Sequence, residues 1–268
     1  PQDSDHFMPY LSLTIGATFM EPDYGGYDSE TLFSASLGGG FRIPFNDNVA
    51  RKDALAVERL KRAGAIVFGK TNVPVLLADW QTFNPIYGTT NNPWDLTCTP
   101  GGSSGGSAAA LAAGLTGLEL GSDIGASIRN PAHYCGVYGH KPTWGICSPQ
   151  GHSLPGALHP GDIAAIGPLA RSADDLRLAM GLIAGPDDID GAGWIIELKK
   201  PKPVSLRGLR VAVMPSHSTA EVDVTVSDAI ERLARALAKK GARVSDKARP
   251  DFNPDEAHKV YLALLRAA

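Results

Sequence analysis

The sequence predicts an α/β fold in which a mixed central β-sheet is sandwiched between helices. Two observations support this prediction. Amphipathic helix patterns alternate with short apolar strand patterns along the chain, and several of the helix patterns end at a glycine, a common helix terminator. A chain of 268 residues with 43% apolar residues can also bury a sizeable core. We therefore expect a single domain over residues 1–268.

The first half of the chain is expected to hold two helices and two strands. Residues 53–64, DALAVERLKRAG, have apolar side chains at helical spacing and end at a glycine. The apolar segment AIVFG at 65–69 predicts a short buried strand, which would place Lys70 just after a strand end. Beyond a loop rich in Pro and Asn, residues 107–114 predict a small-residue helix and residues 115–120 another strand.

The second half is expected to hold three helices and a strand. Two of the helices carry capping boxes, Ser172 with Asp175 and Asn253 with Glu256. The segment ELKKPKPVS at 197–205 is the best linker candidate, and we interpret it as a surface crossing within one domain. The expected elements are helices at 172–185, 224–241 and 253–267 and a strand at 209–215.

Composition excludes several classes of function. The net charge is −3 and the basic residues are scattered, so we expect no nucleic-acid partner. The sequence shows no run of about 18 apolar residues and no secretory leader pattern. We therefore expect neither membrane insertion nor secretion. Cys98, Cys135 and Cys147 are odd in number and lack metal-ligand spacing. Buried reduced thiols and a cytoplasmic location are therefore expected, with no metal and no cofactor.

The glycine-rich segment GGSSGG contains two overlapping G-x-S-x-G patterns, centred on Ser103 and Ser104. Such a pattern marks a nucleophile elbow when a strand precedes it, but the preceding NNPWDLTCTP is turn-forming. An esterase-type triad is therefore disfavoured. A phosphate-binding loop is disfavoured too, because no lysine and hydroxyl residue follow the glycines. A flexible connector would explain the composition alone.

A second serine, Ser127, has the context that the first pair lacks. It follows a predicted strand and a tight turn, and residues 127–136 are a short helix candidate. Such a turn can aim the backbone N–H groups of Ile124, Gly125, Ala126 and Ser127 at one point, which is what an oxyanion hole requires.

Four segments together resemble the amidase signature hydrolases: RAGAIVFGKTNVP, YGTTNNPWDLTCTPGGSSGGSAAALAAG, GSDIGASIRNPAHYCGVYGHKPTWG and GDIAAIGPLARSADDL. They span about residues 53–182. The resemblance implies that Ser127 is the nucleophile, Ser103 a proton relay and Lys70 the base. It also implies a cis peptide bond between Gly102 and Ser103. A lysine must be neutral to act as a base, and burial favours that form.

The same resemblance assigns supporting roles around Ser127. Asp123 and Arg129 would brace the turn through an ion pair, while Ser104, Ile124, Gly125 and Ala126 would contact the substrate or its oxyanion. Ala126 stands where the family usually has a glycine. We interpret Tyr138 and Trp144 as core residues, and His133, His140, His152, His159 and Asp162 as structural or surface residues, since the histidines show no metal-ligand spacing.

Three functions remain open. The leading interpretation is a stand-alone amidase that hydrolyses a small-molecule amide to an acid and an amine or ammonia. The alternative is the amidase subunit of a tRNA-dependent amidotransferase; there we expect GLKPTYGRVSRYG where this chain has GHKPTWGICSPQG, which favours the stand-alone enzyme. A non-catalytic derivative of the fold is disfavoured because all three triad positions are occupied. The family's carboxy-terminal portion is not recognised, so the amidase signature domain is expected to be a partial one, and pairing as a homodimer is left open.

Overall fold

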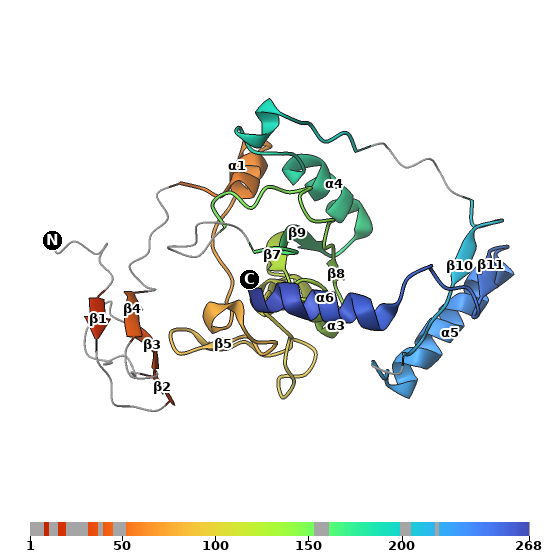
Figure 1. The fold of residues 1–268 in the computed structure, drawn as a ribbon, viewed down its shortest axis with the longest axis horizontal. Helices are drawn as coiled ribbons and strands as arrows, with labels where there is room; N and C mark the ends of the chain where they lie inside the picture. Colours follow the sequence, from red (N-terminus) through yellow and green to blue (C-terminus); the bar gives the residue numbers. More distant parts are fainter. Residues whose placement is uncertain are drawn as a thin grey trace. The chain divides into compact units, whose positions relative to one another are not determined.

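The computed structural model describes residues 8–10, 16–19, 32–36, 40–44, 52–152, 161–198, 205–217 and 220–267 (Figure 1). The chain divides into two compact units, Pro1–Ile196 and Glu197–Ala268. The division falls at the first residue of the Lys/Pro-rich linker candidate. That the two units form one domain stays a prediction.

The amino-terminal part contains a four-stranded sheet for which the sequence offered no prediction. The strand order is β1-β4-β3-β2, and every pair is antiparallel. The strands are β1 (Met8–Tyr10), β2 (Gly16–Phe19), β3 (Leu32–Ser36) and β4 (Gly40–Pro44).

A three-stranded antiparallel sheet lies at the centre of the helices of the first unit. Its order is β7 (Leu118–Asp123), β9 (Ala165–Ala170), β8 (Tyr138–Gly139). Every residue of β9 is buried, as expected of a strand with neighbours on both sides. The register runs from Leu118 opposite Ala170 to Asp123 opposite Ala165. The carboxyl end of β7 therefore delivers Asp123 to the turn that contains Ser127.

Helices cover both faces of this sheet (Figure 1). Helices α2 (Gly105–Ala112) and α3 (Arg129–Cys135) share a buried cluster with Leu169. Helices α1 (Leu55–Arg62) and α4 (Ala173–Ile183) share another with Ile166. Side chains alternate between the faces of a strand, so Ile166 and Leu169 of β9 point to opposite faces. This arrangement is the expected sheet between helices.

Local sequence signals explain where α4 begins and ends. Ser172 Oγ accepts a hydrogen bond from the Asp175 N–H at 3.1 Å and donates to Asp175 Oδ2 at 2.7 Å. Ser172 is thus the N-cap that the sequence predicts, and the Asp175 carboxylate binds its hydroxyl group rather than its backbone N–H. At the other end, the Arg59 guanidinium of α1 donates to the carbonyl oxygens of Ile183, Gly185 and Pro186 at 2.6–3.1 Å. Arg59 thus satisfies carbonyls at the end of α4 and holds α1 against it.

The second unit is a strand-helix-strand arrangement followed by a helix. Strands β10 (Arg210–Ala212) and β11 (Arg243–Ser245) pair in parallel, with α5 (Val224–Lys239) between them in sequence. Helix α6 (Pro254–Ala267) follows, and Asn253 Oδ1 accepts hydrogen bonds from the N–H groups of Asp255 and Glu256. The expected helices and strand of this unit are confirmed.

Four short elements complete the described chain: the 3-10 turns η1 (Val75–Leu77) and η2 (Asp190–Ala192) and the antiparallel strands β5 (Phe83–Asn84) and β6 (Gly88–Thr89).

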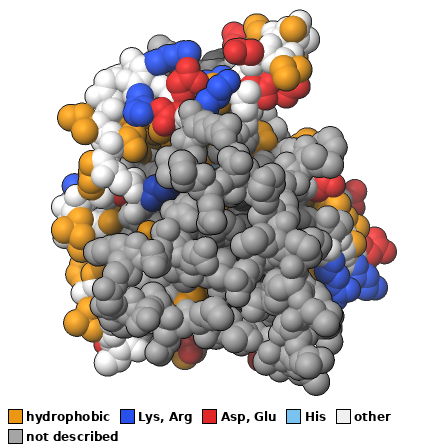
Figure 2. Space-filling model, turned by 90° about the vertical axis from the view of Figure 1, so that its left-hand side faces the viewer, with side chains coloured by type: hydrophobic (Ala, Val, Ile, Leu, Met, Phe, Trp, Pro, Cys, Tyr) orange, Lys and Arg blue, Asp and Glu red, His pale blue; other side chains and the backbone are white. Residues whose placement is uncertain are grey.

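The strand predicted at residues 65–69 does not form. Ile66 is 88% exposed and Phe68 77% exposed, and no strand in the described parts of the chain lies beside them. An apolar segment becomes a strand only when a neighbour satisfies its backbone hydrogen bonds. Large apolar side chains are accordingly found at the surface of the described residues (Figure 2).

Two side chains expected in the core are also at the surface. Tyr138 is 52% exposed and Trp144 54% exposed. Tyr138 belongs to β8, an edge strand of the three-stranded sheet, and no further strand of the described residues pairs with it. The predicted core position was therefore wrong for both.

The cysteines are free thiols, and two of the three are buried. Burial raises the pKa of Cys135 and of Cys147 to about 11, which makes both thiols poor nucleophiles at neutral pH. Cys98 is exposed, against the expectation, because it lies in the turn-rich loop before the glycine-rich segment. Among the described residues, no group of three His, Cys, Asp or Glu side chains could hold a metal ion, and no helix is long and apolar enough to cross a membrane.

Candidate active site

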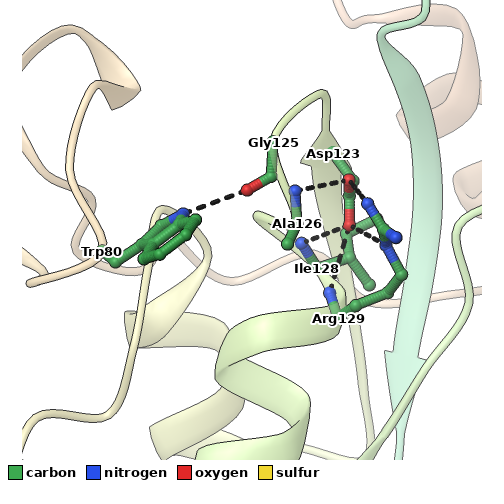
Figure 3. A network of polar contacts seen from close by, with 6 residues as sticks. All are labelled: Trp80, Asp123, Gly125, Ala126, Ile128 and Arg129. Atoms are coloured by element: carbon green, nitrogen blue, oxygen red, sulfur yellow. Dashed lines mark hydrogen bonds and ion pairs between the residues drawn. The ribbon is translucent and has the colours of Figure 1, made fainter. Parts of the chain in front are cut away.

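The turn between β7 and α3 is organised by one buried carboxylate (Figure 3). Asp123 is 1% exposed, and five N–H groups donate to it. Oδ1 accepts from the Ala126 N–H at 3.0 Å and from Arg129 Nη2 at 2.9 Å. Oδ2 accepts from the backbone N–H groups of Ile128 and Arg129 and from Arg129 Nε, at 3.0–3.2 Å. The ion pair expected between Asp123 and Arg129 is therefore present.

The charge on Asp123 is maintained against its burial. Burial by itself would raise the pKa of this carboxyl, but the hydrogen bonds from the Arg129 side chain and from the backbone N–H groups of Ile128 and Arg129 bring the pKa below its ordinary value. Asp123 is thus ionised at neutral pH. Arg129 is half exposed, so its guanidinium keeps much of its hydration while it neutralises the buried charge.

The two serine sites predicted from the sequence lie side by side. Ser103 is 2% exposed and Ser127 7% exposed. The Ser104 N–H donates to the Ser127 carbonyl oxygen at 3.1 Å, and the Gly102 N–H donates to Asn130 Oδ1 at 3.2 Å. These two hydrogen bonds join the glycine-rich loop to the turn from residues that are more than 20 positions apart in sequence.

The glycine-rich loop is a tightly packed structure, which excludes the flexible-connector interpretation. The peptide bond between Gly102 and Ser103 is cis, as the resemblance implied. Residues 101–106 are all buried. Gly101 has φ +81°, and a Cβ there would lie 2.4 Å from Asn130 Oδ1. A Cβ at Gly102 would lie 2.5 Å from the carbonyl oxygen of Asp79, so neither position can hold a side chain.

Lys70 is exposed, as are all residues from Ala65 to Gly69. In the described part of the chain no hydrogen bond joins the Lys70 ammonium to Ser103 or Ser127. The burial expected for Lys70 is not found, because the strand that was to carry it into the core does not form. Its role as the base stays a prediction.

The residues that follow Lys70 are nevertheless anchored to α2. The hydroxyl groups of Thr71 and Ser107 are 2.8 Å apart, and the Gly106 N–H donates to the Asn72 carbonyl oxygen at 3.2 Å. A Cβ at Gly106 would lie 2.4 Å from that same oxygen, so glycine permits this close approach. The structure therefore brings the backbone next to Lys70 against the helix that begins just after Ser103 and Ser104.

The expected oxyanion donors are not equivalent in the structure. The Ala126 N–H is already engaged by Asp123, while the Ser104 N–H is engaged by Ser127. The carbonyl oxygen of Gly125 accepts a hydrogen bond from Trp80 Nε1 at 3.0 Å (Figure 3). Ile124 also takes part in an interaction. The N–H groups of Ala126 and Ser104 thus already donate to acceptors within the site. The oxyanion-binding role of Ser104, Ile124, Gly125 and Ala126 stays a prediction.

Ala126 adopts φ +78°, which is the left-handed region that favours glycine. The family preference for glycine beside the nucleophile therefore has a conformational reason in this turn. Alanine occupies the position at a local cost, which its N–H bond to Asp123 helps to offset.

Sequence reasoning missed several residues that contact the site: Thr71, Trp80, Thr82 and Asn130. Thr82 is fully buried, and its hydroxyl donates to the Gly101 carbonyl oxygen at 2.9 Å. Asn130 follows Arg129 directly, so its place in the SIRNP segment was a usable signal. Nothing in the local sequence pointed to Trp80, because its partner Gly125 lies 45 positions away.

Comparison with known proteins gives a consistent family. A family model described as Amidase matches residues 40–268. The A subunit of glutamyl-tRNA(Gln) amidotransferase from Saccharolobus solfataricus is 40% identical over 201 residues, covering 75% of this chain and 41% of that protein. Its counterpart from Deinococcus deserti is 39% identical over 220 residues, covering 80% and 44%. The chain thus spans less than half the length of these relatives.

Solved structures agree with the sequence relatives. The A subunit of glutamyl-tRNA(Gln) amidotransferase from Thermotoga maritima superimposes with a TM-score of 0.65 at 28% identity, over 84% of this chain and 54% of that one. A bacterial aryl acylamidase, described as a member of the amidase signature enzymes, gives 0.68 at 28% identity, over 83% and 46%. Fatty acid amide hydrolase gives 0.73 at 28% identity, over 82% and 39%.

These relatives contradict the expected set of partners. The sequence interpretation allowed a small-molecule amide and at most a second copy of the chain, with no nucleic acid. The names of the relatives describe one subunit of an assembly and include a tRNA. The scattered basic residues argue only against a cluster of Lys and Arg on this chain that would bind the phosphate backbone. A subunit without such a cluster can still belong to an assembly that acts on tRNA. From the family model and these relatives together, the chain belongs to the amidase family, and its fold is that of the amidase signature enzymes.

Proposed function

We propose that this chain is the amidase portion of the glutamine-hydrolysing component of a tRNA-dependent amidotransferase, and that it releases ammonia from glutamine. One observation supports this above all. Eight curated relatives, 36–40% identical to the chain, are all named as the A subunit of glutamyl-tRNA(Gln) amidotransferase. They outweigh the difference in one motif, GHKPTWGICSPQG, that favoured a stand-alone enzyme.

The proposed chemistry is acyl transfer through Ser127. Its hydroxyl oxygen attacks the amide carbon, and its proton passes through the Ser103 hydroxyl to a neutral Lys70 amine. The C–N bond then breaks, and the proton returns along the same path to the departing ammonia. Water attacks the resulting ester, which gives the carboxylic acid and restores the serine.

The geometry supports this assignment in three ways. Ser103 and Ser127 are both buried, and the direct hydrogen bond between the Ser104 N–H and the Ser127 carbonyl holds their backbones together. The turn that carries Ser127 is set by the ionised Asp123, so the nucleophile is presented from a preorganised backbone. Lys70 lies two residues before Asn72, whose carbonyl oxygen accepts from Gly106 of α2.

The proposal requires a change at Lys70. A lysine acts as a base only in its neutral form, and removal from water favours that form. Because Lys70 is exposed in the structure, the proposal requires that substrate or another protein segment cover it before it acts. The cytoplasmic location expected from the cysteine pattern also stays a prediction.

A second candidate is a stand-alone amide hydrolase. Fatty acid amide hydrolase and the aryl acylamidase superimpose with TM-scores of 0.73 and 0.68, above the 0.65 of the amidotransferase structure. These enzymes are named for acting on amides that carry fatty acyl or aryl groups. The two candidates share the chemistry and differ in the acyl group that enters.

The test is a comparison of substrates. The purified protein is offered glutamine, with and without glutamyl-tRNA(Gln), and a panel of aryl and acyl amides, while ammonia or amine release is measured. Preferential release of ammonia from glutamine supports the amidotransferase assignment. Hydrolysis of the panel with glutamine untouched would favour the stand-alone enzyme.

Covalent labelling tests the nucleophile separately. A fluorophosphonate should label the protein, and Ser127→Ala should abolish both labelling and turnover. Ser148→Ala is the matched control, since Ser148 is as buried as Ser127, at 7% exposed, but its hydroxyl donates to Asp187. Persistent labelling of Ser127→Ala would remove the proposed mechanism.

The base is tested by comparing leaving groups. Lys70→Ala should reduce amide hydrolysis more than ester hydrolysis, because a departing amine needs the returned proton and an alkoxide needs it less. Equal losses on both substrates would mean that Lys70 is not the base.

A further inference from the structure

We propose that Trp80 is a positioning residue for the nucleophile, because its indole N–H holds one peptide group of the Ser127 turn in the orientation the site needs. The consequence for catalysis rests on the proposed function of Ser127. The conformational part does not, and it can be tested without turnover.

The peptide group between Gly125 and Ala126 is held at both ends (Figure 3). Its carbonyl oxygen accepts from Trp80 Nε1 at 3.0 Å, and its N–H donates to Asp123 Oδ1 at 3.0 Å. A peptide group is planar, so fixing its two polar ends fixes the rotation of the whole unit. That unit precedes Ser127 by one residue.

The two ends are held from different parts of the chain. Asp123 lies three residues before Ala126 and belongs to the turn itself. Trp80 comes from the segment that follows Lys70 and reaches the turn across 45 positions of sequence. The orientation of this peptide therefore depends on a long-range contact as well as a local one.

The backbone of Trp80 packs against the loop that carries Ser103. A Cβ at Gly102 would lie 3.0 Å from the Cα of Trp80, so the absence of a side chain lets these backbones meet. The Thr99 hydroxyl donates to the Trp80 carbonyl oxygen at 3.4 Å. Trp80 thus rests with its backbone on the Ser103 loop and with its indole on the Ser127 turn, and it couples the positions of the two serines.

The contact between Trp80 and the Ser127 turn depends on the hydrogen bond rather than on burial of the indole ring. Trp80 is 58% exposed, so much of its ring surface stays in water. The indole N–H is the only polar group of a tryptophan side chain and can only donate. Removing that donor while keeping an aromatic ring isolates the proposed role.

The turn has a reason to relax when the bond is lost. Ala126 is at φ +78°, a conformation that a residue with a Cβ disfavours. Rotation of the preceding peptide would relieve that residue and move the N–H away from Asp123. The Trp80 and Asp123 bonds together oppose this rotation.

The experiment compares Trp80→Phe with Trp94→Phe. Trp94 is a matched control, because it is 73% exposed and its Nε1 donates to the Cys135 carbonyl oxygen at 2.8 Å, at the far end of α3 from Ser127. The first readout is hydrogen exchange of the Ala126 amide. Trp80→Phe should speed this exchange about tenfold, the effect expected of one neutral hydrogen bond, and Trp94→Phe should leave it unchanged.

The second readout is reactivity at Ser127. In Trp80→Phe the rate of fluorophosphonate labelling and kcat should each fall about tenfold, while KM stays within about twofold. Adding Ala126→Gly to Trp80→Phe should restore part of the labelling rate, because glycine adopts this conformation without the strain that drives the peptide group to rotate. Ala126→Gly alone should have a smaller effect.

The two proposals fail in different ways. Ala126 exchange that is unchanged in Trp80→Phe would overturn the positioning role of Trp80, whatever the activity. An equal loss of labelling in Trp94→Phe, or a loss confined to KM, would overturn it as well. Labelling of Ser127→Ala would instead remove the proposed function and leave the exchange result as the test of Trp80.

Discussion

The Ser127 turn and the Lys70 segment are both predicted to carry catalytic residues, yet they differ in burial and in the contacts that hold them. In the turn, five N–H groups converge on one buried carboxylate, and all come from residues within six positions of Asp123. In the Lys70 segment, every residue from 65 to 70 is exposed. The anchors begin only at Thr71, whose hydroxyl partner on Ser107 is 36 positions away.

The comparison shows that the two parts of the predicted site depend on different contacts. The Ser127 turn depends mainly on residues close in sequence, whereas the Lys70 segment depends on residues far away in sequence. A short stretch of chain contains most of what builds the turn, namely an acceptor, its five donors and a helix start, and Trp80 adds one long-range contact. The apolar side chains of the Lys70 segment are exposed, and nothing in its own sequence can bury them. The turn is therefore held in place by its own residues and Trp80, whereas the Lys70 segment is anchored in the described structure only from Thr71 onward.

The largest effect should come from removing the charge that organises the turn. Asp123→Asn keeps the shape of the side chain but replaces an acceptor with an N–H₂ group that faces other donors. We expect a loss of about 3 kcal/mol in the free energy of unfolding, together with loss of activity. Urea unfolding followed by circular dichroism measures the first, and fluorophosphonate labelling of Ser127 the second.

Asp95→Asn is the control, because Asp95 also accepts from a nearby N–H and a hydroxyl but is fully exposed. Its effect on unfolding should be much smaller. Similar losses in the two variants would mean that the turn is not centred on Asp123.

Acid should weaken the same interaction more gradually. The pKa of Asp123 in the folded protein lies below the ordinary carboxyl value of 3.8. Its ionised form therefore stabilises the fold above that ordinary value, and the contribution is lost as the pH falls through the lower folded pKa. The difference in unfolding free energy between the wild type and Asp123→Asn should be flat from about pH 8 to pH 5 and then shrink.

Urea unfolding of both proteins at each pH isolates this one carboxylate from the others. A difference that stays constant down to about pH 3 would show that the charge of Asp123 does not stabilise the turn.

A smaller effect is expected at the anchor of the Lys70 segment. Ser107→Ala leaves the half-buried Thr71 hydroxyl without its partner, which should cost about 1 kcal/mol in unfolding free energy. If this anchor positions Lys70, amide hydrolysis should fall more than ester hydrolysis. Thr71→Val removes the other hydroxyl without affecting the hydrogen bond between Ser107 and Glu119, so it should lower the two rates in the same way as Ser107→Ala; Thr97→Val, in an exposed turn, should change neither rate. A uniform loss on both substrates would mean that the anchor serves stability alone.

The smallest effect concerns the strained residue of the turn. A left-handed alanine costs about 1–2 kcal/mol, while glycine adds about 0.5–1 kcal/mol of entropy loss on folding. Ala126→Gly should therefore stabilise the protein by about 0.5–1 kcal/mol, seen as a small rise in the melting temperature. The control is Ala113→Gly at the end of α2, where φ is −76° and alanine is unstrained. Stabilisation by the control alone would mean that Ala126 carries no strain.

Much of the fold could be predicted from the sequence because its signals are local. The N-cap residues Ser172 and Asn253 mark the starts of α4 and α6 to the residue. The strand expected at 115–120 is β7, shifted by three residues toward Asp123. The ion pair between Asp123 and Arg129 joins positions six apart, so it too lies within reach of a motif.

Only the tertiary structure decided the remaining features, because they depend on contacts between distant segments. The apolar pattern at 65–69 is the same whether or not a neighbouring strand exists, so it could not reveal that the segment and Lys70 would be exposed. Nothing near Trp80 in the sequence indicates that its indole reaches Gly125. The sequence by itself determined which residues can form the turn and the helices with their caps. The packing of segments 20 to 45 positions apart decided how the glycine-rich loop and the Ser127 turn join and what holds them together.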